Sequence, residues 1–106
     1  MSLYGEWKDC AFDISDSTTI SDACDLGNNY EYIQVIYPAM TACTMSVYVC
    51  SSLGGTYVPL GNSASATVGA SASADTYAIG GYQFIKLISS TAQLADRAVI
   101  VRGLRA

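Results

Sequence analysis

The chain has 106 residues, a net charge of −4 and no histidine; 51% of its residues are hydrophobic and only 13% are charged. This length fits one domain with its own core, and the composition excludes a disordered chain. The five basic residues are dispersed, which argues against nucleic-acid binding. No apolar stretch reaches the roughly 20 residues of a membrane helix. The first residues lack a signal-peptide pattern, so we expect one domain, residues 1–106, synthesised in the cytoplasm.

Alternating apolar and polar residues predict strands along most of the chain. The expected strands cover residues 10–15, 20–26, 30–37, 41–51, 56–58, 82–89 and 97–104. Turn residues separate most of them at short intervals, and no window has the apolar period of a helix. We therefore expect an all-β fold, a single antiparallel β-sandwich of jelly-roll-like form, with residues 1–9 as a candidate N-terminal arm.

A low-complexity run, NSASATVGASASAD, covers residues 62–75. Such composition usually forms a flexible surface loop. As a strand it would be flat and lined with small side chains, so that the backbone of a second subunit could approach closely. We expect a loop with a short strand, and we take Ala64, Ala66, Val68 and Ala70, which would share one face, as candidate interface residues.

Trp7 and Arg97 complete the candidate interface. Trp7 precedes the first expected strand, where it would either cap one end of the sandwich or anchor the arm to a neighbouring subunit. Arg97 opens the last expected strand and either pairs structurally within the chain or is a simple surface cation.

Four cysteines, at positions 10, 24, 43 and 50, form no zinc-ribbon pairs. In a reducing cell they would be small buried apolar residues. A three-residue hairpin loop at 16–18 would instead place Cys10 opposite Cys24 and permit a disulfide between them. Cys43 and Cys50 are seven residues apart on one expected strand, so they point to opposite faces and cannot bond each other.

The sequence contains no recognisable set of catalytic residues. Without histidine, the usual general base near neutral pH is missing, and no phosphate-binding or nucleophile motif occurs. Asp13, Asp16, Asp22 and Asp25 cluster around the first expected hairpin, but their spacing fits no calcium loop. We expect no enzyme activity, no cofactor and no metal site.

The C-terminal third resembles a family of small virion proteins encoded in the structural gene clusters of tailed phages. That family has a strand reading aromatic-Ile-Lys-hydrophobic-x-Ser, a loop containing Gln-Ala and a last strand opening with Asp-Arg. The matching positions here are Phe84-Ile85-Lys86-Leu87-Ile88-Ser89, Gln93 and Asp96-Arg97, with further matches at Ala23-Cys24-Asp25-Leu26-Gly27, Pro38, Met45–Val49 and Gly54–Leu60. The ordered matches span residues 18–105.

The resemblance implies a β-sandwich that decorates or cements a phage capsid. Its expected partners are copies of itself, as a dimer or trimer, and the major capsid protein or other virion proteins, and its expected location is the virion. The alternative from the residues is a carbohydrate-binding module, because eight tyrosines and Trp7 could stack on sugar rings. Glycans are then the expected partners. Tyrosine is equally common in strands and interfaces.

Overall fold

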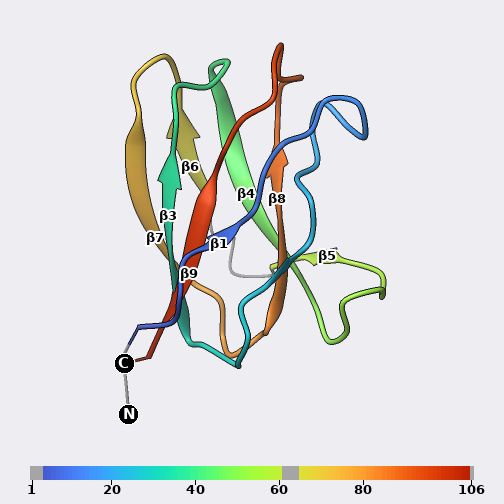
Figure 1. Cartoon of the computed structure of the whole chain (residues 1–106), viewed down its shortest axis with the longest axis vertical. Helices are drawn as coiled ribbons and strands as arrows, with labels where there is room; N and C mark the ends of the chain where they lie inside the picture. Colours follow the sequence, from blue (N-terminus) through green and yellow to red (C-terminus); the bar gives the residue numbers. More distant parts are fainter. Residues whose placement is uncertain (1–3, 61–64, 106) are drawn as a thin grey trace.

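The computed structural model describes residues 4–60 and 65–105, with the side chains of residues 65 and 66 excepted. The described residues form nine strands and no helix. Two antiparallel sheets pack face to face, as Figure 1 shows. The prediction of an all-β antiparallel sandwich is therefore confirmed.

One sheet has four strands and the other has five. The four-stranded sheet runs in the order β1 (Lys8–Asp9), β9 (Ile100–Leu104), β3 (Tyr32–Tyr37) and β7 (Ser73–Ala78). The five-stranded sheet runs in the order β2 (Cys24–Asp25), β8 (Phe84–Ser89), β4 (Cys43–Cys50) and β5 (Val58–Pro59), and β6 (Ser65–Val68) pairs with β4 beside β5.

The core lies between the sheets because every second side chain of a strand points inward. On β4, Cys43, Met45, Val47 and Val49 are all buried, as their alternation predicts. Ile85 and Leu87 of β8 lie beside them in the same sheet. Buried residues of β3 and β9 in the other sheet face them across the sandwich: Ile33, Val35, Tyr37 and Val101. The strand before Pro38 ends at Tyr37, as expected from the missing proline amide.

The predicted first hairpin is wrong. Its two arms pair with different sheets, because β1 and Phe12 pair with the C-terminal segment while Ile20 and β2 pair with β8. The turn itself starts at Asp13, whose carbonyl accepts the N–H groups of Asp16 and Ser17. The segment 10–26 therefore crosses from one sheet to the other, since burying both apolar faces stabilises the chain more than a local hairpin would.

The Ala/Ser run contains more strand than expected. Strands β6 and β7 occupy most of residues 65–78 and are joined by a short turn that carries the chain from one sheet to the other. β7 lies at the edge of the four-stranded sheet, at the left of Figure 1. Small residues hid this strand from the sequence pattern because they give no contrast between an apolar and a polar face.

The described part of the expected N-terminal arm, residues 4–9, lies along β9 of its own chain. Tyr4 forms a bridge with Leu104, the Gly5 N–H donates to the Gly103 carbonyl at 2.8 Å, and β1 continues the pairing. The ring of Tyr30 lies so close to Gly103 that an added Cβ there would come within 2.0 Å of it. The segment is thus an edge of the sandwich and is held by backbone pairing.

Candidate functional site

The solvent-facing side of the four-stranded sheet carries aligned rows of residues. Pairing places Arg102, Gln34 and Thr76 in one row across β9, β3 and β7. The next row contains Ile100, Ile36 and Ala74. This face therefore combines a polar row with an adjacent apolar row, and Ile36 is largely exposed on it.

Arg102 is the centre of this face. Its guanidinium carbon lies 4.3 Å from the centroid of the Tyr4 ring and 4.6 Å from that of Trp7, which is within cation–π range. The Arg102 Nε–H donates to the Gln34 Oε1 at 2.7 Å. The two rings and the amide fix the guanidinium, so the charge stands at a defined position.

A shallow hollow of about 380 Å³ opens beside this group, and we call it the Trp7–Arg102 hollow. Trp7 and Arg102 line one side of it, and Ile36, Asp75 and Thr76 line the other. Trp7 is 39% exposed and presents an aromatic surface there. An aromatic ring and a cation beside one depression can bind a polar ligand that also has an apolar face.

The edge of β7 is a second candidate surface. The Ile79 N–H donates to the Glu31 carbonyl, and bonding alternates along an antiparallel pair. Ala74, Thr76 and Ala78 therefore turn their backbone N–H and C=O groups away from β3. Among the described residues, nothing pairs with these groups.

The other sheet edges are short. Strands β1, β2 and β5 have two residues each, β5 contains Pro59, which has no N–H to donate, and β6 beside it has four residues. Such features normally protect a sheet edge from further pairing. β7 has six residues, neither proline nor lysine, and small side chains on its outer face.

The four candidate residues of the Ala/Ser run have different positions. Ala64 lies outside the described residues, and Ala66 pairs with Met45 within β6. Val68 is only 4% exposed and packs in the core, so the expectation that it contacts a second subunit is corrected. Ala70 is exposed on the turn between β6 and β7.

Arg97 belongs to a hydrogen-bonded network within the chain. Its Nε–H donates to the Gln93 Oε1 at 3.2 Å, and its Nη2 donates to the Thr41 Oγ1 at 3.1 Å. Gln93 is 2% exposed and also accepts the Thr41 N–H at 2.9 Å. Of the two readings weighed for Arg97, structural hydrogen bonding fits this geometry, which ties the loop before β9 to the start of β4.

Cys10 and Cys24 are free thiols in this structure, and both are buried. They lie near each other although the predicted hairpin does not form, because β1 and β2 face each other at one side of the sandwich. The disulfide between them stays a prediction.

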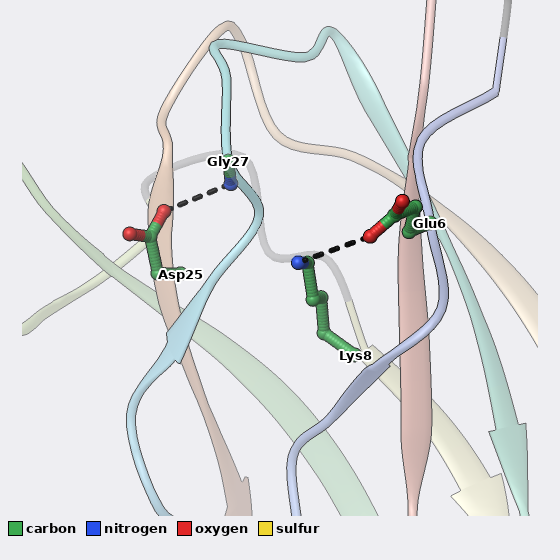
Figure 2. A network of polar contacts seen from close by, with 4 residues as sticks. All are labelled: Glu6, Lys8, Asp25 and Gly27. Atoms are coloured by element: carbon green, nitrogen blue, oxygen red, sulfur yellow. Dashed lines mark hydrogen bonds and ion pairs between the residues drawn. The ribbon is translucent and has the colours of Figure 1, made fainter.

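The acidic residues near β1 and β2 take part in local turns. The Asp25 Oδ1 accepts the Gln83 Nε2–H at 2.9 Å and the Gly27 N–H at 2.8 Å, and Figure 2 shows Lys8 nearby, paired with Glu6 at 3.5 Å. Gln83, Gly27 and the Lys8 charge hold the pKa of Asp25 below its usual value. Within residues 4–60 and 65–105, no three acidic or cysteine side chains gather as a metal site would require.

The sequence did not identify Tyr4, Gln34, Thr76 or Arg102 as site residues. The alternation of residues 99–102 does place Arg102 on the outer face of the last strand. Its neighbours come from strands distant in sequence, and only the pairing of β9 with β3 and of β3 with β7 brings them together.

Comparison with known proteins gives likeness in fold alone. No family model matches the sequence, and no curated protein is similar to it in sequence. The SPBc2 prophage-derived protein YomS superposes with a TM-score of 0.53 at 13% identity, covering 93% of this chain and 95% of its own. The F5/8 type C domain of a Bacteroides fragilis protein superposes with a TM-score of 0.56 at 6% identity, covering 94% of this chain and 73% of its own.

The coat protein of Tobacco streak virus gives a TM-score of 0.46 at 10% identity, covering 100% of this chain and 88% of its own. Over the part of the chain that the structure describes, no helix has the length and apolar character needed to cross a membrane.

Proposed function

We propose that this chain is a structural protein of a tailed-phage virion, which decorates or cements the capsid through self-association and capsid contacts. The ordered sequence resemblance over residues 18–105 supports this class, and a prophage-derived protein shares the fold. The proposed role is binding, without substrate turnover. The unpaired six-residue edge of β7 is the observation that carries it, because such an edge can add a strand from another subunit.

A second copy fits this edge in one register best. A two-fold axis at Thr76 pairs Thr76 with Thr76 and Ala74 with Ala78, and it places Asp75 opposite Tyr77 of the other copy. An axis at Asp75 would place two carboxylates directly opposite each other, which is destabilising. Small side chains at 74 and 78 let the backbones approach, so two four-stranded sheets would join into one continuous sheet.

The test compares Thr76→Pro with Thr76→Val. Proline removes the outward N–H and blocks edge pairing without breaking the pairing with β3, whereas valine keeps the N–H. On the two-fold axis this removes two hydrogen bonds, so we expect self-association to weaken roughly tenfold or more in Thr76→Pro only. Native mass spectrometry measures this, and co-sedimentation with capsids measures docking. A chain that stays monomeric at high concentration and does not bind capsids would refute the proposal.

Glycan binding is the second candidate, favoured by the Trp7–Arg102 hollow. An aromatic surface flanked by Arg102 and Thr76 suits a sugar ring, which has an apolar face and polar hydroxyls. We expect any signal on a glycan array to be lost in Trp7→Ala and kept in Tyr82→Ala, because Tyr82 is similarly exposed but does not line this hollow. Absence of signal on the unmodified chain, or equal loss in both variants, would exclude the hollow as a sugar site.

A further inference from the structure

Two cysteines from opposite sheets meet at one side of the sandwich. Cys10 directly follows β1 of the four-stranded sheet, and Cys24 opens β2 of the five-stranded sheet. Their side chains are 0% and 2% exposed, and Cα atoms of β1 and β2 lie within 8 Å of each other. The Asp22 N–H donates to the Ala11 carbonyl at 2.9 Å, so the segment that follows β1 lies beside the segment that leads into β2. The two buried cysteines therefore lie close together, where the edges of the two sheets meet.

The other two cysteines are differently placed. Cys43 and Cys50 stand at opposite ends of β4, and the Cys43 thiol hydrogen-bonds Met45 Sδ at 3.5 Å. They cannot bond each other, since they are seven residues apart on one extended strand. They therefore form a natural control for the pair at positions 10 and 24.

Polar groups surround the Cys10 sulfur. It lies 3.3 Å from the Ser21 Oγ and 3.6 Å from the Asp22 carbonyl oxygen. The hydrogen bonds from Cys24, Ser21 and the Leu87 backbone lower the pKa of Cys10, although burial opposes them. Donation of the hydrogen bond to Cys10, together with burial, raises the pKa of Cys24. Because the Ser21 hydroxyl lies within hydrogen-bond distance and can donate to a thiolate, Cys10 is the expected attacking sulfur of the two.

We propose that Cys10 and Cys24 form a redox-convertible disulfide that joins the two sheets, made by exchange with a small-molecule disulfide of the oxidised-glutathione type. The Cys10 thiolate attacks one sulfur of that molecule, whose S–S bond breaks and releases one small thiolate. Cys24 then loses its proton and attacks the Cys10 sulfur, so that the bond between the cysteines forms and the second small thiolate leaves. The protein loses two electrons and two protons, which appear on the two released thiols.

Both sulfurs are buried, so the reaction needs local opening. β1 and β2 have two residues each and lie at sheet edges, where opening costs less than global unfolding. Once formed, the bond closes the loop between Cys10 and Cys24 and fixes the segment that carries Tyr4 and Trp7. A reducing cell would keep the pair open, and release into oxidising surroundings would close it. This chemistry is independent of whether the chain docks on a capsid.

The experiment incubates the full chain with oxidised glutathione in mild urea, which permits local opening. We expect the intact mass to fall by two hydrogen atoms, peptide mapping to link residues 10 and 24, and the melting temperature to rise by roughly 10 °C. Dithiothreitol should reverse all three changes. The variant with Cys43→Ala and Cys50→Ala should behave in the same way.

Cys24→Ala should instead stop at a mixed disulfide on Cys10, with the mass of one added glutathione and no rise in melting temperature. If this variant does not fold, mapping on the unmodified chain decides the matter. Four free thiols remaining after oxidation in urea, or a link to Cys43 or Cys50, would overturn the proposal.

Discussion

The two edges of the four-stranded sheet are built in opposite ways. At the β1 edge, Tyr4 and Trp7 flank Arg102, and the ring of Tyr30 covers Gly103. At the β7 edge, the outward backbone groups of Ala74, Thr76 and Ala78 have no partner among the described residues, and the side chains beside them are small. The first edge is closed by aromatic packing, and the second is left open.

The difference between the two edges shows which part of the surface of a small β-sandwich is available to a partner. Aromatic residues and an arginine at the β1 edge stabilise the chain itself and also leave the Trp7–Arg102 hollow beside them. The β7 edge contributes little beyond its own pairing with β3 and its buried residue Tyr77. An edge without proline, lysine or a covering segment exposes backbone groups that another strand can satisfy.

Gly103→Ala should have the largest effect, because it tests how tightly the β1 edge is closed. The new Cβ would overlap the base of the Tyr30 ring, which cannot swing away cheaply near its own backbone. We expect the free energy of unfolding, measured by urea denaturation, to fall by about 3 kcal/mol. Gly69→Ala is the control, since its Cβ would meet only Ala42 at 3.9 Å. A cost under about 1 kcal/mol would mean that the ring is loosely held.

Tyr77→Phe tests the internal anchor of the β7 edge. The Tyr77 and Tyr37 hydroxyls are 2.7 Å apart and buried, so the substitution leaves the Tyr37 hydroxyl without this partner. We expect the free energy of unfolding, measured by urea denaturation, to fall by about 2 kcal/mol, and self-association to weaken as well if β7 shifts. Tyr48→Phe, on β4, is the matched control. Equal, small losses in both variants would show that the hydroxyl pair does not hold β7.

The same pair predicts the response to alkaline pH. Burial raises the pKa of Tyr77 to about 12 and raises that of Tyr37 as well, from an unfolded value near 10. Because the folded pKa lies above the unfolded one, this stabilisation is complete below about pH 10 and is lost as pH rises through about 12. The urea midpoint should therefore fall more steeply over this range in the unmodified chain than in Tyr77→Phe. Parallel curves of the urea midpoint against pH for the two proteins would contradict this prediction.

Arg102→Met should have the smallest effect. Methionine keeps the apolar stem but loses both cation–π contacts and the hydrogen bond to Gln34, and the site is half-exposed. We expect the free energy of unfolding, measured by thermal denaturation, to fall by about 1 kcal/mol. Arg105→Met is the comparison, since Arg105 lies 5.4 Å from the centroid of the Tyr30 ring. A larger loss for Arg105 would show that the stacked rings contribute little.

Sequence pattern predicted the strands whose two faces differ in polarity. β3, β4, β8 and β9 appear close to their expected bounds, and the inward side chains of β4 are the expected ones. β7 was missed because alanine and serine give no such contrast. The first hairpin was wrong because turn residues at 13–17 fit both a hairpin and a crossing between sheets, and only packing against β8 and β9 selects the crossing.

The sequence by itself determined an all-β sandwich without histidine-based chemistry, since alternation and composition are local properties. Only the tertiary structure decided which residues share a surface. Arg102, Gln34 and Thr76 come from three strands far apart in the chain. Cys10 lies near Cys24 although the predicted hairpin does not form. Such neighbours depend on strand order and register, which follow from burying both inner faces at once.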